Sequence, residues 1–250
     1  MKKFLKWLKI AIETALIFIV SGAVTTAITK NIYAEVLINQ FKKKGVLDEE
    51  HSTDKLKVYK IASDEDRSTV LEGYYPGRQG DILISLKSEL TIPFVTEFIS
   101  FFAGGHAGLV LGDYEDYLDE TTEENTLEST AVGGSDFASV DEKNDYWIDN
   151  SPYKEVICLR VKTTEQERKR VLAEAMALAG DPYNYSFILG TKNRSYCSDV
   201  IAKAYSKIGV NLNKDGFTTS IYDLLISNET YISYYHYIDN YGVKYIYYLA

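Results

Sequence analysis

One cysteine of this chain sits where a reactive thiol is expected. Cys197 has polar neighbours on both sides and opens a predicted helix over residues 196–208, for which Ser195 is a natural N-cap. Unpaired N–H groups and the positive dipole end at a helix N-terminus stabilise a thiolate. The thiolate is the form that attacks carbonyl carbon. The competing interpretation is a buried structural cysteine, which Cys158 is expected to be because it lies in an apolar run of strand length.

His106 is the histidine best placed to act with that thiol. It follows two glycines, which let the backbone turn closely, and opens an apolar strand over residues 106–111. The other two histidines lie in a polar stretch (His51) and in a Tyr-rich tail (His236). A histidine at a strand end is more often structural than catalytic, so His106 is a candidate base only in combination with Cys197.

A carboxylate is available to orient that imidazole. Glu128 lies in a short β-type run, residues 126–130, that follows the strand of His106. Adjacent antiparallel strands bring opposite side chains to about 5 Å, close enough for Glu128 to fix the tautomer of His106 and stabilise its charged form. The alternative is an exposed strand glutamate.

Several other functions lack their sequence signals. No His-Glu-x-x-His or Cys-x-x-Cys run indicates a metal site, no glycine motif would cradle a phosphate, and no Gly-x-Ser-x-Gly elbow is present. We therefore expect neither a metal nor a cofactor. The net charge of −9, from 27 basic and 36 acidic residues, argues against a nucleic-acid surface.

The spacing of apolar residues predicts an α+β fold. Besides the runs that contain His106 and Glu128, strands are expected at residues 82–85, at 155–161 and in the Tyr-rich tail. Residues 164–179 form a good helix pattern, with Thr163 or Thr164 as cap. The 21 tyrosines are best explained by a half-buried β surface; the alternative is a groove for sugar or peptide.

The N-terminal residues form a separate, membrane-directed segment. Lys2, Lys3, Lys6 and Lys9 precede a largely apolar run from Ile10 to Thr29, whose helical length of about 30 Å just crosses a hydrocarbon core. An uncleaved anchor is favoured over a cleaved signal peptide. Both put the remainder outside the cytoplasm by the positive-inside rule, although three lysines at 42–44 weaken that orientation. We expect an anchor or signal over residues 1–30, a helical and linker segment over 31–72, and a catalytic domain over 73–250.

The order of the motifs resembles a known family. The chain is similar to the YiiX/YebB-like group, circularly permuted relatives of the NlpC-type papain-like hydrolases, to which the lecithin retinol acyltransferases are also similar. In that group the His strand precedes the Cys helix. The resemblance covers about residues 74–222 and rests on five motifs in sequence: Gly80-Asp-Ile-Leu, His106-Ala-Gly-Leu-Val-Leu-Gly112, Leu127-Glu-Ser-Thr130, Gly180-Asp-Pro-Tyr-Asn-Tyr185 and Tyr196-Cys-Ser-Asp199.

The resemblance implies a fold and a role for each matching residue. The fold would be a permuted papain-like domain, an antiparallel sheet packed against helices. Cys197 matches the nucleophile, His106 the general base and Glu128 the residue that orients it. Tyr196 would line the acyl pocket or assist the oxyanion, and Tyr183 falls at a structural or pocket-lining position.

These roles predict a cysteine peptidase or amidase that works through an acyl-enzyme. Together with an extracellular site, the NlpC-type resemblance points to amide bonds of cell-wall (peptidoglycan) peptide as substrate. One alternative is a thiol acyltransferase or esterase acting on acyl lipids, favoured if the apolar stretch at residues 91–102 forms a rim beside Cys197. The other is a non-catalytic surface module that binds a wall fragment or a protein, favoured if Cys197 and His106 lie far apart.

Overall fold

The computed structural model describes residues 2–63, 77–87, 94–112, 126–130, 134–138, 147, 154–186, 193–213 and 218–250. The domain boundary predicted at residue 72 lies outside these residues. The helices and strands, in chain order, are α1 (Lys2–Lys42), β1 (Val46–Leu47), β2 (Leu56–Ile61), β3 (Ile82–Ser85), α2 (Val95–Phe102), β4 (His106–Val110), β5 (Thr126–Thr130), β6 (Gly134–Ala138), β7 (Glu155–Val161), α4 (Glu165–Met176), α5 (Cys197–Ser206), α6 (Ile221–Ile226), β8 (Thr230–Ile238) and β9 (Lys244–Leu249).

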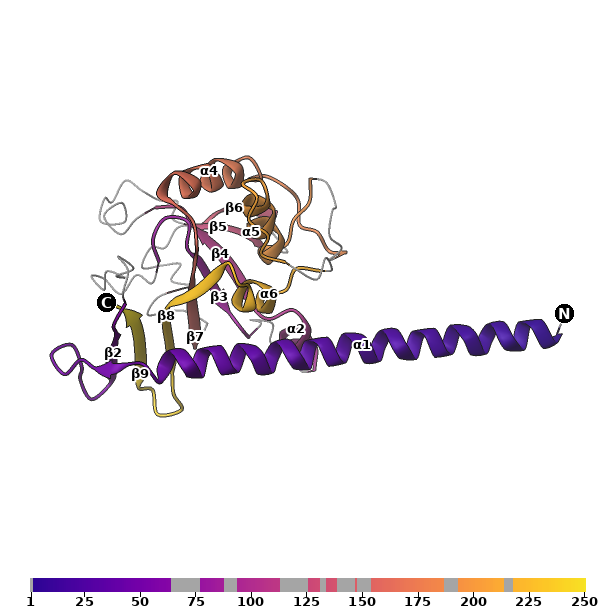
Figure 1. The fold of residues 1–250 in the computed structure, drawn as a ribbon, viewed down its shortest axis with the longest axis horizontal. Coiled ribbons are helices and arrows are strands. Elements are labelled where there is room, and N and C mark those ends of the chain that lie inside the picture. The colour runs from indigo at the N-terminus through magenta and orange to yellow at the C-terminus, as the bar shows by residue number, and fades with distance from the viewer. Residues whose placement is uncertain are drawn as a thin grey trace.

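These strands form a single sheet in the order β1-β2-β9-β8-β7-β3-β4-β5-β6 (Figure 1). Neighbouring strands are antiparallel, except that β2 and β9 run parallel. The predicted α+β class is confirmed, and the strands expected around residues 82–85, 106–111, 126–130 and 155–161 are β3, β4, β5 and β7. The helix predicted from residue 164 is α4, whose N-cap Thr164 forms a capping box with Glu167.

The two faces of the sheet are covered differently. One face packs against apolar side chains of α1, α4, α5 and α6 in the main core. The other face carries a smaller apolar cluster with Trp147 at 1% exposure. The described helices of the main core all lie on that first face of the sheet. There α5 packs against β4 and β5, the strands that carry predicted site residues.

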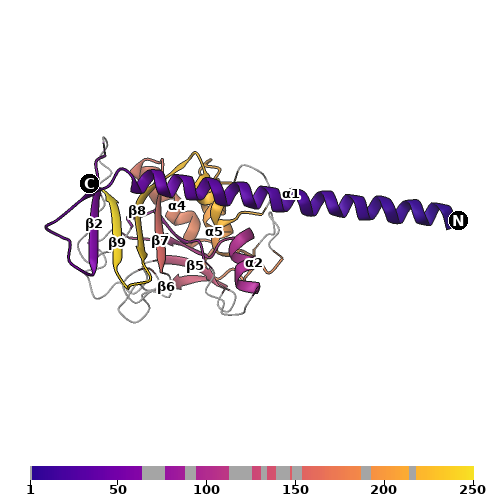
Figure 2. The same ribbon diagram turned by 90° about the horizontal axis from the view of Figure 1, so that it is seen from below.

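The C-terminal half of α1 packs into this core, whereas its N-terminal half is exposed. Residues 5–23 are exposed on all sides, whereas Ala34, Ile38 and Phe41 are at most 8% exposed and belong to the main core. This exposed N-terminal part, the free half of α1, projects beyond the body (Figures 1 and 2). The helix does not break near residue 30, where we expected a separate segment to begin.

The helical and linker segment expected over residues 31–72 also contains a strand that the sequence did not predict. Residues Leu56–Ile61 form β2, which pairs with the C-terminal strand β9. Its buried positions, Val58 and Ile61, are separated by the partly exposed Tyr59 and Lys60. A short strand with charged side chains near a sheet edge carries little apolar signal in sequence, because only part of it is buried.

The Tyr-rich tail forms β8 and β9, and its rings stack across neighbouring strands. Tyr237 lies on Tyr245 with ring centroids 4.7 Å apart, and Tyr59 lies on Tyr247 at 4.6 Å. Lys42, the last residue of α1, places its ammonium 4.5 Å from the centre of the Tyr237 ring. These stacked tyrosines therefore support the end of α1 by aromatic packing and cation–π attraction.

A buried ion pair fastens the middle of α1 to the body. Lys30 Nζ lies 2.6 Å from Asp223 Oδ1, with the two side chains 14% and 6% exposed. Asp223 also accepts hydrogen bonds from the backbone N–H and hydroxyl of Ser220 at the N-cap of α6. Asn31 adds a bond from Nδ2 to the carbonyl of Phe101 in α2, 2.9 Å long.

We predict that Lys30→Ala lowers the free energy of unfolding by about 3 kcal/mol, because it leaves the Asp223 carboxylate buried without its cation. Thermal or denaturant unfolding of the full chain in detergent micelles measures the change. The control is Lys9→Ala on the same helix, where the Lys9–Glu13 pair is 76% and 57% exposed and the expected change is below about 0.5 kcal/mol. Equal effects of the two substitutions would contradict the prediction.

Candidate active site

The backbone before His106 is tightly packed, which explains the glycines that precede it. Gly105 donates its N–H to the carbonyl of Ser85, 3.0 Å away, at the end of β3. A Cβ on Gly105 would lie 2.1 Å from the carbonyl oxygen of Lys87, so no other residue fits. This close approach fixes the start of β4 and with it the direction of the His106 side chain.

Glu128 faces His106 across the β4–β5 pair. His106 Nε2 lies 2.6 Å from Glu128 Oε2, and the side chains are 15% and 6% exposed. The residue directly opposite Glu128 is Gly108, where a Cβ would come within 3.2 Å of Glu128 Cγ and Oε1. The glycine leaves room for the carboxylate to reach diagonally to the imidazole.

Two further side chains, which the sequence did not point to, hold the other oxygen of this carboxylate. Trp147 Nε1 donates to Glu128 Oε1 at 2.8 Å, and Thr126 Oγ1 donates to the same atom at 2.9 Å. The Trp147 ring also stacks on His106, with centroids 5.8 Å apart and planes within 11°. A signal for Trp147 was available, since it is one of only two tryptophans and stands among polar residues.

Cys197 is the first residue of α5, so its predicted place at a helix N-terminus is confirmed. The predicted N-cap Ser195 is wrong: the cap residue is Tyr196, with no capping side chain. Ser195 is instead tied by its backbone to the segment before it. Its N–H donates to Pro182 O and its carbonyl accepts from Asn184 N. Its carbonyl also accepts from Ser129 Oγ at 2.9 Å, which joins the cysteine segment to β5 beside Glu128.

The two residues that flank Cys197 both bond the backbone of Thr219, which lies just before α6. The hydroxyl of Tyr196 accepts from the backbone N–H of Thr219 at 2.9 Å, and Ser198 Oγ donates to the Thr219 carbonyl at 2.7 Å. Both side chains are almost fully buried. The Tyr196 hydroxyl thus serves as a backbone contact that steadies the turn around Cys197.

Tyr183 lies beside the cysteine through an isolated bridge between residues 183 and 195. Its ring is half-buried and meets Tyr185 edge-on, with centroids 5.0 Å apart. Burial and then the neighbouring Cys197 raise the pKa of the Tyr183 hydroxyl well above its usual range, so it stays a neutral donor. The structure therefore brings together Cys197, His106, Glu128, Tyr196 and Tyr183, all five residues singled out by sequence.

The charge state of the histidine follows from its partners. Burial lowers the pKa of His106, but the Glu128 carboxylate and a hydrogen bond with Cys197 outweigh it and raise the pKa well above 6.5. Because Nε2 is bonded to Glu128, Nδ1 is left to face the thiol. Burial likewise raises the pKa of Glu128, but His106, Trp147 and Thr126 lower it overall. The pair is held as imidazolium and carboxylate.

Asp81 and Asp199, both in the motifs, have other partners. Arg160 donates from Nε and Nη2 to the two oxygens of Asp81, at 2.9 and 2.7 Å, and the pair is buried. Asp199 is 1% exposed and lies 2.6 Å from Lys203 Nζ. Both carboxylates are neutralised within the core, which favours a structural role for them.

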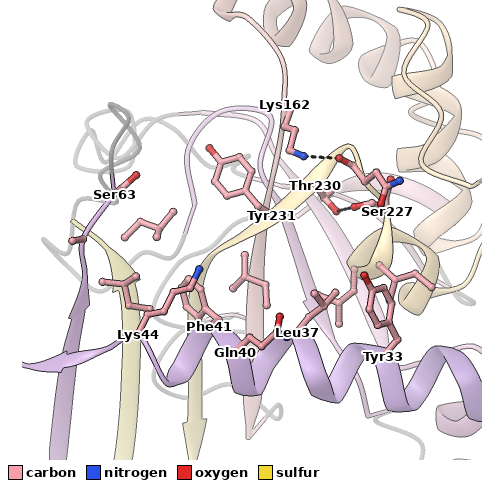
Figure 3. A pocket seen from close by; sticks show the side chains of 17 residues that line it. Tyr33, Leu37, Gln40, Phe41, Lys44, Ser63, Lys162, Ser227, Thr230 and Tyr231 are labelled. Carbon is pink, nitrogen blue, oxygen red and sulfur yellow. Dashed lines mark hydrogen bonds between the residues drawn. The ribbon is translucent and has the colours of Figure 1, made fainter.

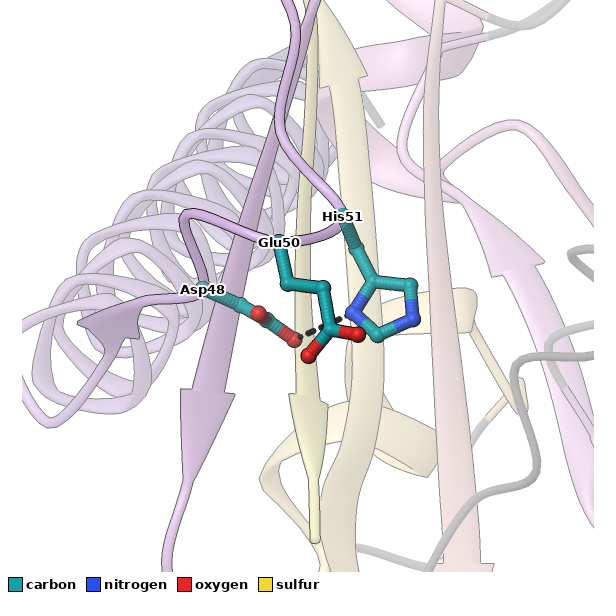
Figure 4. Close-up of side chains that lie close together, drawn as sticks. All are labelled: Asp48, Glu50 and His51. Atoms are coloured by element: carbon teal, nitrogen blue, oxygen red, sulfur yellow. Dashed lines mark hydrogen bonds and ion pairs between the residues drawn. The ribbon is translucent and has the colours of Figure 1, made fainter.

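A group of potential metal ligands in the described residues lies far from this site. Asp48, Glu50 and His51 follow β1 at the opposite end of the sheet from β4 and β5 (Figure 4). Asp48 Oδ2 is already 2.7 Å from Lys60 Nζ and 2.9 Å from His51 Nδ1. A cation would have to displace the ammonium of Lys60, so this group is best described as an ion-pair network.

A pocket of ≈ 590 Å³ in the described part of the chain is also elsewhere (Figure 3). It lies between the C-terminal half of α1, the end of α6 and the start of β8, and includes Tyr33, Phe41 and Tyr231 in its lining. None of the five site residues lines it. The candidate active site is therefore identified from its hydrogen-bonded side chains and not from this cavity.

Comparison with known proteins gives the family. Residues 78–225, more than half of the chain, match the model of the permuted papain-like amidase enzymes YaeF/YiiX, family C92. The chain belongs to this family. A C92 protein is a hydrolase of the cysteine peptidase and amidase type, and the match covers nearly the range on which the sequence resemblance rested.

The structural comparison adds a more distant similarity. A crystal structure described as that of the metalloprotein yiiX from Escherichia coli O157:H7 aligns with 63% of this C92 chain and 97% of its own. The sequence identity is 16% and the TM-score 0.47. No significantly similar sequence was found among curated proteins.

We predict that the His106 imidazole stays protonated above pH 7, because Glu128 and Cys197 stabilise its charge. Histidine NMR titration of the full chain measures this, and Glu128→Gln should move the transition to lower pH. His236 is the internal control: burial and then Lys244 lower its pKa to about 3, so it should stay neutral through the same range. Titration of His106 at or below 6.5 would contradict the prediction.

Proposed function

We propose that this protein hydrolyses amide bonds with Cys197 as nucleophile, His106 as general base and acid, and Glu128 as the group that orients His106. The observation that carries the proposal is the continuous series of contacts from the thiol through the imidazole to a buried carboxylate. A non-catalytic binding module would have no need for such a series. Cys197 also lies in the first turn of a helix, where a thiol is activated by stabilisation of its thiolate form.

The proposed reaction has two halves. The proton of Cys197 resides on His106, so the reaction starts from a thiolate–imidazolium pair, and the thiolate attacks the carbonyl carbon of the amide. The imidazolium then gives the proton to the leaving amine as the C–N bond breaks, and an acyl-thioester remains on Cys197. In the second half the neutral His106 removes a proton from water, the hydroxide attacks the thioester, and the carboxylic acid leaves as the thiolate–imidazolium pair is restored.

The negative oxygen of each tetrahedral intermediate needs donors close to Cys197. Val200 makes the first bond within α5, from its N–H to the carbonyl of Tyr196, so the N–H groups before it have no partner inside the helix. We assign oxyanion stabilisation to these backbone groups. We assign Tyr183 to the pocket wall and Tyr196 to support of the nucleophile turn, in place of the direct oxyanion contact considered from sequence.

The substrate that we favour is a peptide amide of the cell wall. The family's description as amidases supports amide rather than ester chemistry. The second candidate is an acyl lipid, and a specific observation favours it: the exposed aromatic helix α2 ends four residues before His106. Of the apolar stretch at 91–102, the part before residue 94 lies outside the described residues.

We further propose that the first 30 residues anchor the protein in a membrane with the catalytic domain outside the cytoplasm. Helix α1 includes a segment long and apolar enough to cross a bilayer, a property that signal sequences share. Packing of Ala34, Ile38 and Phe41 into the core supports an anchor, because the helix continues without a break from the free half into the fold. Lys42, which weakened the orientation in sequence, is engaged with tyrosines of the body.

We predict that the full chain in detergent or liposomes releases amide-cleavage products and that Cys197→Ala abolishes this. Purified peptidoglycan and acyl-ester or acyl-amide lipids are offered separately, and products are identified by mass spectrometry. The control is Cys158→Ala, which should retain hydrolysis because the Cys158 thiol is fully buried in the core. Activity that survives in Cys197→Ala, or no turnover of either class by the native chain, would overturn the proposal.

We also predict that Trp147→Phe lowers kcat/KM about tenfold, since loss of a bond to a buried carboxylate costs about 1–3 kcal/mol. Phenylalanine keeps a ring over His106 but removes the N–H that lowers the pKa of Glu128. The acid limb of the pH–rate profile should therefore move to higher pH.

The matched control for this variant is Trp7→Phe at the other tryptophan, which lies on α1 and is 71% exposed. It should leave both the rate and the profile unchanged. A rate loss in Trp147→Phe without movement of the acid limb would assign Trp147 to packing alone.

A further inference from the structure

Helix α2 presents large aromatic side chains to solvent. Phe94, at its N-cap, is 88% exposed and Phe98 is 63% exposed. Phe98 and Phe101 each lie with their ring centroids 4.8 Å from that of Phe102. The one charged residue of the helix is Glu97. Contiguous exposed apolar surface of this kind marks a place where a protein meets a partner or a membrane.

The position of α2 relative to α1 indicates which partner. Asn31 of α1 bonds the carbonyl of Phe101, and both views show α2 beside α1 at the end of the body from which the free half of α1 projects (Figures 1 and 2). Ala27 is the residue nearest the N-terminus of α1 that is buried in the body. The aromatic surface therefore lies close to the point where α1 leaves the body.

The length of the free half sets the depth of α2. Residues 5–23 are exposed and span about 28 Å as a helix, close to the roughly 30 Å of a hydrocarbon core. If they cross a bilayer, its hydrocarbon boundary falls near residues 24–27. Asn31, which contacts α2, is one helical turn (about 6 Å) beyond Ala27. That distance places α2 within the headgroup layer, where amphipathic helices bury apolar side chains about 5–10 Å deep.

We propose that α2 is seated in the interfacial layer of the same bilayer that α1 crosses, with Phe94 and Phe98 among the lipids. This rests on the proposed membrane anchor. A second copy of the chain is a poorer occupant, because an eight-residue helix offers far less than the roughly 800 Å² per partner of a stable interface.

The proposed position of α2 also determines how far the proposed active site lies from the lipid. The chain passes from α2 through residues 103–105 directly into His106. On the other side, Tyr222 Oη bonds the carbonyl of Ser100, and Ile221 N bonds that of Ala103, so α6 and α2 are held together. The base of the proposed reaction thus lies within one short turn of the lipid surface, and the enzyme acts on amide bonds held close to the membrane.

Photo-crosslinking in liposomes tests this with the full chain. The photoreactive analogue benzoyl-phenylalanine replaces one aromatic residue at a time: Phe98 on α2, Phe18 on the free half of α1, or Tyr241. Tyr241 is 93% exposed and lies in the turn between β8 and β9, at the end of the body away from α2. Adducts are identified by mass spectrometry after irradiation.

The expected result is lipid adducts at positions 18 and 98 and none at 241. Adducts at 18 without adducts at 98 above the level at 241 would overturn the seating of α2 and leave the anchor intact. Crosslinks at 98 to a second copy of the chain would also overturn it. No lipid adduct at 18 would overturn the anchor and the seating of α2 together, whereas the hydrolase assay with Cys197→Ala is independent of both.

Discussion

The buried carboxylate of Glu128 is the constraint around which the site is built. A carboxylate that is 5% exposed is stable only if hydrogen bonds and an opposite charge replace the water it has lost. Here Thr126 comes from its own strand, Trp147 from a position 19 residues further along the chain and His106 from the neighbouring strand. With His106 neutral, none of the carboxylate's described hydrogen-bond partners would carry a positive charge. The need to balance that charge is what makes the imidazole a strong base.

The site combines a local half with a distant half. His106 and Glu128 are 22 residues apart and meet because β4 and β5 are neighbours in the sheet. Cys197 arrives from much later in the chain, and its position depends on the ties that Ser195 makes to β5 and to residues 182–184. The permuted order, with the histidine strand before the cysteine helix, thus makes the proposed base and its carboxylate a strand pair, to which the helix of the proposed nucleophile is added.

These differences in range explain what the sequence could predict. Cys197, His106 and Glu128 could be found because a helix start, a glycine pair and strand periodicity are local signals, whereas Tyr183 and Tyr196 were implied by the family resemblance. Trp147 could not be assigned, because its role depends on which carboxylate it reaches. Ser195 has the right side chain for an N-cap, but its backbone bonds to Pro182 and Asn184 compete with that role. Strand β2 was missed because its pairing with β9 is a contact between the two ends of the chain.

Helix α1 connects the proposed membrane segment to the nucleophile through few steps. Lys30 pairs with Asp223, which accepts a hydrogen bond from the N-cap residue Ser220. The backbone of the neighbouring Thr219 is held by Tyr196 and Ser198, on either side of Cys197. Each contact is buried or nearly so, which leaves little freedom for the body to turn about the helix. A flexible tether would let the active site sample any height above a membrane. With the proposed anchor in place, a helix that continues into the core would instead fix both the height and the orientation of Cys197, so the geometry of the fold would set which amide bonds the proposed nucleophile reaches.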